Sequence, residues 1–366
     1  MRMKTNLTAA ALALFLAACA HNPSDSIPLA AQGSFTVGGG YVTHPGTFKQ
    51  ENFIAPDGQR AYGDFAYVKY QAPANAKPLP LIFQHGGAQS SRTWESTVDG
   101  REGFDTLFLR KGYSVYLLDQ PRSGKSNLST QAVTPDTPWA SNPMYGDKTL
   151  WLLSRMGHFD ASGKPVANTQ FPAGEAAYQA FQQAWTIGSG PLDNELNADV
   201  LAQLVDRTGG AVLVTHSMGG TIGWRAALRS DKVKAIVAWE PGGTPFIFPE
   251  NEMPKITQVR FAALSGAAMG VPMNEFLKLT KIPIVLYYGD YIQVGSENVG
   301  EDKWGTELAM AKQFVDTINR HGGDATLVHL PEIGIKGNSH FLMGEKNNRQ
   351  LVDLMAAWLK EKGLDR

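Results

Sequence analysis

The chain has 366 residues, of which 43% are hydrophobic and 18% charged, and its formal net charge is −1. This size suits one large α/β domain with insertions, or two domains, and supplies enough apolar side chains for a sizeable core. The balanced charge and the lack of a basic run exclude the electrostatic footprint of a nucleic-acid-binding protein.

The N-terminal residues are predicted to be a signal peptide. Arg2 and Lys4 precede a short apolar run at residues 7–18, which is rich in Ala and Leu. Such a run is too short to span a bilayer and is typical of the core of an export signal. Residues 1–18 are therefore predicted to be removed from the mature protein.

A candidate lipidation site follows this run. The run ends in LAAC, whose last letter is Cys19, and this resembles a bacterial lipobox, in which the cysteine thiol is lipidated and becomes the new N-terminus. A plain secretory signal with an incidental cysteine is the alternative. Cys19 is the only cysteine, so the mature chain cannot form an internal disulfide. The segment at 21–34 is rich in Ser, Pro, Asn and Gln, and residues 19–33 are predicted to be a flexible tether.

The expected location follows from the same segment. Ala20 stands where an aspartate often retains such proteins in the inner membrane. We therefore expect an exported periplasmic or outer-membrane lipoprotein of a Gram-negative bacterium, held to the membrane through Cys19.

Short apolar runs alternate with helical patterns through residues 34–366, which are predicted to form the folded domain. The predicted strands are 34–41, 65–70, 79–84, 114–119, 211–215, 234–239, 282–288 and 325–330. The predicted helices are 103–111, 197–207, 220–229, 309–321 and 348–362. The later strands are unbroken aliphatic runs, typical of parallel strands covered on both faces. The alternation predicts an α/β fold with a mostly parallel, twisted sheet flanked by helices.

One long segment between the fourth and fifth predicted strands departs from this alternation. It is rich in Pro, Trp, Asn and Gly, with a helical pattern at 175–185. We predict that about 134–190 forms a cap over the C-terminal edge of the sheet, and that 244–274 adds a second lid segment. Aromatic residues such as Trp151 and Phe181 argue against disorder in the cap.

The stretch from Ala211 to Gly220 is the most informative motif. An apolar strand runs directly into Ser217, and a helical pattern follows. This is the strand–turn–helix setting of the G-x-S-x-G elbow, with Thr215 in place of the first glycine. The motif predicts a nucleophilic serine at Ser217; a serine that only caps the helix is the alternative.

A serine nucleophile needs a base and an acid that orients it. His340 lies in a loop after the last predicted strand and before the last helix, which is where this chain order places the base. Two acids compete, because Glu240 and Asp290 each follow a strand and so lie at its C-terminal end. Spacing alone leaves this choice open.

The oxyanion of an acyl-transfer intermediate needs backbone donors. Gly86 and Gly87 follow the third predicted strand, where glycines let amides approach a substrate closely. One of these amides and that of Met218, the residue after the nucleophile, are the candidate donors. A simple tight turn is the alternative reading of the two glycines.

Metal and cofactor chemistry has little support in the sequence. Residues 119–126 contain Ser-Gly-Lys-Ser but lack the frame of a phosphate-binding loop, which favours a loop near the mouth of the site. No Cys/His cluster has zinc-ligand spacing, and we expect no metal and no cofactor.

Together these motifs resemble the α/β-hydrolase superfamily over residues 34–366. The chain looks closer to a small group of secreted bacterial esterases in which the acid is a glutamate after the sixth strand. The stretches AIVAWEPG at 235–242 and GNSH at 337–340 are the specific ones. The resemblance implies an α/β-hydrolase fold, Glu240 as the acid and a structural role for Asp290. Gly87 and Ala88 depart from the group, whose oxyanion loop can carry bulkier residues there.

The expected function is hydrolysis of a small-molecule carboxylic ester through an acyl-enzyme on Ser217, with His340 as base and Glu240 as orienting acid. A lactonase on the same fold, or a non-catalytic lipoprotein that binds an apolar ligand, remain as alternatives. The expected partners are the substrate and a membrane, with no nucleic acid. The sequence leaves the oligomeric state open, a homodimer included.

Overall fold

The computed structural model of the protein describes residues 26–126, 128–131, 146–186, 188–256, 260–261 and 266–366. The predicted signal peptide, the candidate lipidation site Cys19, the start of the predicted cap and part of the second lid segment lie outside the described residues. None of the helices formed by the described residues is long and apolar enough to cross a bilayer.

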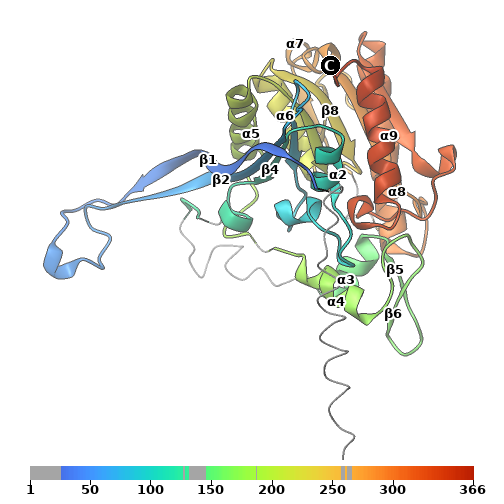
Figure 1. The fold of residues 1–366 in the computed structure, drawn as a ribbon, viewed down its shortest axis with the longest axis horizontal. Helices are drawn as coiled ribbons and strands as arrows, with labels where there is room; N and C mark the ends of the chain where they lie inside the picture. The colour runs from blue at the N-terminus through green and yellow to red at the C-terminus, as the bar shows by residue number, and fades with distance from the viewer. Residues whose placement is uncertain (1–25, 127, 132–145, 187, 257–259, 262–265) are drawn as a thin grey trace, which may run out of the picture.

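The core is an eight-stranded sheet whose order is β1-β2-β4-β3-β7-β8-β11-β12 (Figure 1). The strands are β1 (Leu29–Thr43), β2 (Arg60–Pro73), β3 (Leu81–Gln84), β4 (Val115–Asp119), β7 (Ala211–His216), β8 (Val233–Trp239), β11 (Pro283–Tyr288) and β12 (Asp324–His329). From β4 to β12 every neighbouring pair is parallel, whereas the pairs β1–β2 and β2–β4 at one edge are antiparallel. The predicted mostly parallel sheet is confirmed.

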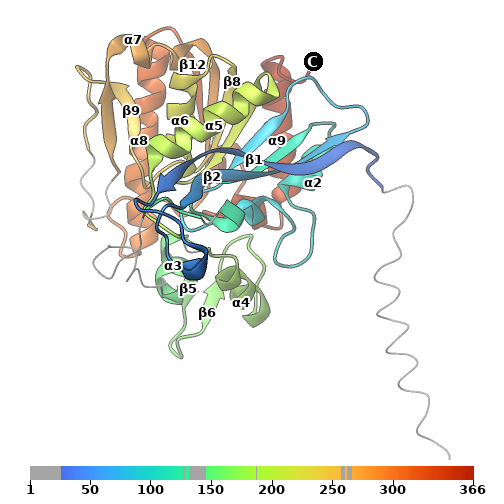
Figure 2. The same ribbon diagram turned by 90° about the vertical axis from the view of Figure 1, so that its left-hand side faces the viewer.

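Helices cover both faces of this sheet (Figures 1 and 2). They are α2 (Phe104–Arg110), α5 (Asn194–Thr208), α6 (Gly219–Arg229), α8 (Val299–Arg320) and α9 (Asn348–Glu361). The buried side chains of α5, α6 and α8 belong to one apolar cluster, and those of α2 and α9 belong to a second. Each face of the sheet therefore has its own core, as expected for parallel strands that are apolar throughout.

Helix α8 begins ten residues earlier than predicted. Its first half contains Gly300 and Gly305, which weaken a helical pattern. The structure gives the reason for Gly300, because a Cβ there would lie 2.0 Å from the carbonyl oxygen of Leu152. A tertiary contact thus requires glycine at position 300, and this glycine is what weakens the helical pattern in the sequence.

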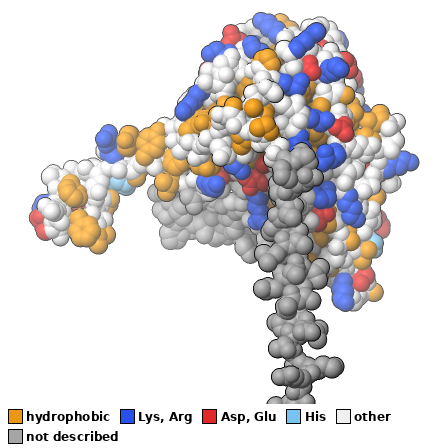
Figure 3. Space-filling model, viewed as in Figure 1, with side chains coloured by type: hydrophobic (Ala, Val, Ile, Leu, Met, Phe, Trp, Pro, Cys, Tyr) orange, Lys and Arg blue, Asp and Glu red, His pale blue; other side chains and the backbone are white. Residues whose placement is uncertain are grey.

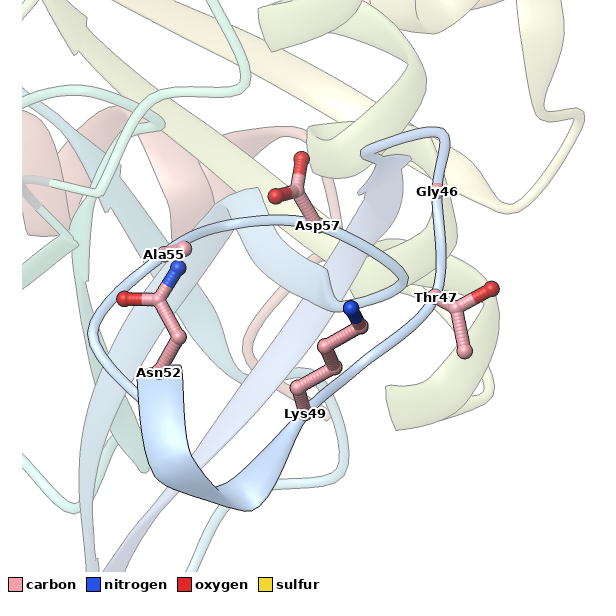
Figure 4. A pocket seen from close by; sticks show the side chains of 6 residues that line it. All are labelled: Gly46, Thr47, Lys49, Asn52, Ala55 and Asp57. Atoms are coloured by element: carbon pink, nitrogen blue, oxygen red, sulfur yellow. The ribbon is translucent and has the colours of Figure 1, made fainter.

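Strands β1 and β2 form a hairpin whose loop end projects from the body (Figure 1). Phe48, Phe53 and Ile54 in the loop at its end are exposed, and Figure 3 shows hydrophobic side chains grouped along this arm. The loop encloses a hollow of about 370 Å³ lined by residues that include Lys49 and Asp57 (Figure 4). The residues added at the loop end of the two strands, 42–43 and 60–64, belong to this projection, whereas 29–33 and 71–73 lengthen the strands at the opposite end.

The insertion between β4 and β7 forms a separate layer beside one end of the sheet (Figure 2). Its described part contains α3 (Asp147–Leu153), β5 (Gly157–Phe159), β6 (Pro165–Ala167) and α4 (Glu175–Gln183). Edge-to-face contacts of Trp151 with Phe171, Tyr178 and Phe181 hold it together. Its predicted role as a cap remains a prediction, and we refer to residues 146–190 as the cap segment.

The predicted second lid segment also has regular structure where it is described. It contains β9 (Phe246–Pro249), β10 (Ala268–Val271) and α7 (Met273–Phe276), and β9 pairs with β10 in parallel. The side chains of Phe246, Ile247 and Phe248 are buried in the same apolar cluster as α6 and α8. Short 3₁₀ turns complete the chain at 50–52, 91–94, 124–126, 279–281, 330–333 and 342–344.

Candidate active site

Ser217 stands at a sharp turn between β7, which ends at His216, and α6, which begins at Gly219. Its φ of 54° lies in the left-handed region, which is a strained conformation for a residue with a side chain. The turn is held because Ser217 N donates to the carbonyl of Trp239 at 3.0 Å. Gly219 must be glycine, since a Cβ there would lie 2.6 Å from the carbonyl oxygen of His85. The local geometry is that of a strained elbow presenting a serine.

Glu240 follows β8 directly and is fully buried. Its amide donates to the carbonyl of Tyr287 at 2.8 Å, which ties it to the end of β11. Its Oε2 accepts from Nδ1 of His340 at 2.7 Å, while its Oε1 accepts from the amide of Gly289 at 2.6 Å. The structure therefore brings together a carboxylate and an imidazole that are 100 positions apart in the chain.

The loop that carries His340 is held on two sides. The amide of His340 donates to the carbonyl of Ser154 at 3.0 Å, and the carbonyl of His340 accepts from Nε2 of His216 at 2.9 Å. The Trp304 ring lies 4.1 Å from the imidazole, centroid to centroid. His216 thus supports the backbone of His340 from beneath the elbow.

Burial is the main cause that lowers the pKa of His340 well below its ordinary value of 6.5, and the positive charges of Arg155 and Lys303 lower this pKa further. An imidazole in this setting is neutral at neutral pH. With Nδ1 donating to Glu240, its Nε2 carries a lone pair and can accept a proton.

A cavity of about 530 Å³ lies over these groups, and Ser217 and His340 both line it. Within the described residues, no hydrogen bond joins the serine hydroxyl to the imidazole; such contacts often tighten only when substrate is bound. The cap segment contributes Leu150, Leu153 and Trp185 to the wall.

The candidate oxyanion donors lie beside the serine. Gly87 and Met218 line the cavity, and Gly86 packs so close to the elbow that a Cβ on it would lie 2.8 Å from Cβ of Ser217. A Cβ on Gly87 would lie 2.2 Å from Sδ of Met218. In the part of the chain that the structure describes, the amides of Gly87 and Met218 have no protein acceptor. These two donors are therefore free to bind a ligand oxygen.

Asp290, the competing acid, binds a different part of the site. Its carboxylate accepts from the amides of Gly337 at 2.9 Å and Tyr291 at 2.8 Å. These contacts hold the start of the loop that carries His340, while Glu240 is the carboxylate that meets the imidazole.

The remaining sequence motifs also have clear positions. Asp119 accepts from the amides of Ser91 at 2.6 Å and Lys125 at 2.9 Å, so it orders the loop at 119–126. Residues 120–123 of this loop line the cavity. Among the described residues, no group of three or more His, Cys, Asp or Glu could hold a metal ion.

Two charged residues near the imidazole were not identified from the sequence. Arg155 comes from the end of α3, and its guanidinium donates to Oε1 of Glu240 at 2.5 Å. Lys303, from α8, lines the cavity and binds Glu307 at 3.0 Å. Neither lies in a recognisable motif, because both reach the site only through the packing of distant helices.

Comparison with known proteins places the chain in a family. Residues 81–364 match the sequence pattern of the Alpha/beta hydrolase family. A solved structure of a novel bacterial esterase is similar, with 31% identity and a TM-score of 0.70 over 93% of this chain and 98% of that one. A probable secreted lipase, phiG, from the fungal strain ATCC 74256 is 27% identical over 81% of this chain and 86% of its own length.

Proposed function

Because this chain belongs to the alpha/beta hydrolase family, we propose that it is a carboxylic ester hydrolase that works through an acyl-enzyme on Ser217. Its relatives named as an esterase and a lipase support ester hydrolysis as the reaction. The observation that carries the proposal is the 2.7 Å contact between Glu240 and His340 beside a cavity that Ser217 also lines.

The first half of the reaction uses all three side chains. Glu240 accepts from Nδ1 of His340, which leaves Nε2 free to take the proton of the Ser217 hydroxyl. The serine oxygen then attacks the ester carbonyl and forms a tetrahedral intermediate. The buried carboxylate stabilises the imidazolium that results, so the charge separates at low cost.

The intermediate collapses when the alcohol leaves with the proton from Nε2 of His340, which gives an acyl group on Ser217. Water then repeats the sequence: His340 takes its proton, the hydroxide attacks the acyl carbon, and the carboxylic acid leaves as the serine recovers its proton. The amides of Gly87 and Met218, with that of Gly86 as the alternative to Gly87, would bind the oxyanion in both halves.

The cavity favours a small or medium ester with an apolar part. Its walls include Leu150, Leu153, Trp185 and Trp304, and its volume of about 530 Å³ lies within the range of small-molecule sites. A lactone is an internal ester that the same groups would open, so an ester and lactone panel is part of the test.

The decisive experiment replaces the nucleophile. Ser217→Ala should lower turnover of p-nitrophenyl butyrate by a factor on the order of 10⁴ to 10⁶ and abolish labelling by a fluorophosphonate probe. Unchanged hydrolysis by this variant would refute the role of Ser217. A wild-type protein that is neither labelled nor active on the panel would instead favour a ligand-binding lipoprotein.

We also propose that the protein is exported and lipid-anchored. The relative named as a secreted lipase supports export, and the lipobox-like sequence supports an anchor at Cys19. Expression in a Gram-negative host with labelled palmitate should give a lipid-labelled band in the wild type and none in Cys19→Ala. An unlabelled wild-type band would leave a plain secretory signal as the answer.

A further inference from the structure

The cap segment places an arginine at a backbone position where glycine is normally found. Helix α3 ends with Ser154 as its C-cap, and Arg155 follows with a φ of 55°. Met156 N donates to Trp151 O at 3.1 Å and Arg155 N to Leu152 O at 3.0 Å, which is the Schellman pattern. Its left-handed residue is usually glycine, because a side chain strains the backbone there. An arginine that keeps this strained conformation indicates that its side chain has a function that glycine could not supply.

The side chain is buried and reaches the candidate acid. The guanidinium and the Glu240 carboxylate are both fully buried, and Nη2 donates to Oε1 at 2.5 Å. Nε donates to the carbonyl of Asp290 at 3.0 Å, and the Trp304 ring lies 5.3 Å from the guanidinium carbon. One arginine therefore joins the cap segment to the strand ends that carry both competing acids.

We propose that Arg155 is a positioning residue that supplies the buried counter-charge of Glu240 and aims its carboxylate at His340, so that the cap segment supplies part of the catalytic machinery. The inference rests on the proposed function, since it assigns a role toward the acid of the proposed triad. Arg155 and Gly289 occupy Oε1 and leave Oε2 for the imidazole. Without the guanidinium, the buried carboxylate would lose its counter-charge and one of the donors to Oε1 that fix its orientation toward Nδ1.

The same helix end is fixed to the base. The carbonyl of Ser154 accepts from the amide of His340 at 3.0 Å, and that of Leu153 accepts from Nε1 of Trp304 at 2.8 Å. The close approach of Gly300 to Leu152 locks α3 against α8. The end of α3 thus contacts the backbone of the base and the side chain of the acid at once.

The charges around His340 set the direction of the pH effect. Arg155 from the cap segment and Lys303 from α8 are positive, Glu240 from the end of β8 is negative, and the His216 ring from β7 lies tilted, 4.5 Å from the imidazole between centroids. Glu345 contacts the same loop through Ser339. Removing the guanidinium takes away a charge that lowers the pKa of His340. The acidic limb of kcat/KM should therefore move to higher pH.

The test compares three variants of Arg155 with a control in the full chain. Arg155→Met removes the charge, Arg155→Lys keeps it without the planar fork, and Arg155→Gly removes the side chain from a backbone that glycine suits. Arg229→Met is the control, because Arg229 pairs with Glu195 and Asp199 on partly exposed surface away from the cavity. Each folded variant is assayed for kcat, KM and pH dependence with p-nitrophenyl butyrate.

We expect kcat to fall about 10- to 100-fold in the Met and Gly variants with little change in KM, as when a partner that orients a catalytic group is lost. The midpoint of the acidic limb of kcat/KM in these two variants should move up by about one pH unit or more. Arg155→Lys should recover most of the lost kcat and most of the pH shift. Met and Gly variants that match Arg229→Met in kcat and pH profile would overturn the proposal, as would a loss confined to KM. Ser217→Ala, run in parallel, separates this failure from failure of the proposed function, because it must be inactive if the function holds.

Discussion

Exchanging the two competing acids for their amides tests the catalytic assignment most sharply. In Glu240→Gln, the amide oxygen would stay with its two donors, Arg155 and the amide of Gly289, so the NH₂ group would face Nδ1 of His340. Nδ1 must then accept, Nε2 carries the proton, and the base has the wrong tautomer. A tautomer error of this kind lowers kcat by about 10⁴, or about 5.4 kcal/mol of activation free energy.

The same substitution has a cost in stability. It leaves the buried guanidinium of Arg155 without a counter-charge, and breaking a buried ion pair typically costs about 3–5 kcal/mol of unfolding free energy. Asp290→Asn keeps an oxygen for Gly337 or Tyr291, so we expect it to lose less than about tenfold in kcat and little stability.

The assay is steady-state hydrolysis of p-nitrophenyl butyrate at pH 8, with urea unfolding of each variant to confirm that the measured protein is folded. Wild type and Ser217→Ala set the upper and lower limits of the rate. Glu240 is not the acid if Asp290→Asn loses more activity than Glu240→Gln, or if folded Glu240→Gln keeps a tenth or more of the wild-type kcat.

Two further predictions concern pH. Because burial, together with Arg155 and Lys303, lowers the pKa of His340 well below 6.5, kcat/KM should stay level as pH falls to 6.5 and decline only below it; a half-maximal point at or above pH 6.5 would contradict this. Burial also raises the pKa of Glu345 from 4.5 to about 7. The folded state then holds this proton more tightly than the unfolded state, so stability from this group is fully present below pH 4.5 and is lost as pH rises through about 7. The loss amounts to about 3 kcal/mol, and urea unfolding at pH 5 and pH 8 should show it in the wild type and not in Glu345→Gln; equal pH dependence in both would contradict it.

The sheet and the elbow could be predicted because their signals are local. Apolar runs mark each strand whatever surrounds it, and the turn at Ser217 needs only a buried strand, small residues and a helix start. The start of α8 was missed because Gly300 weakens the helical pattern there. This residue is required by its close contact with α3, which a local sequence pattern does not reveal.

The choice between the two candidate acids could not be made from local sequence signals. Glu240 and Asp290 follow adjacent strands, so the sequence by itself determined that both carboxylates lie at one edge of the sheet. Whether the imidazole meets one or the other depends on the path of a loop 100 positions from Glu240. The resemblance to known esterases favoured Glu240, and its role as acid stays a prediction for the amide variants to test.

The positions of the strands and the elbow at Ser217 were thus readable from the chain, because each depends on neighbours within a few residues, and the order of segments along the chain singled out His340 as the candidate base. The tertiary structure alone decided that Arg155, 85 positions from Glu240, is buried against that carboxylate. The physical reason is that a buried charge is tolerable only beside an opposite one, and which pair meets depends on how helices from distant segments pack.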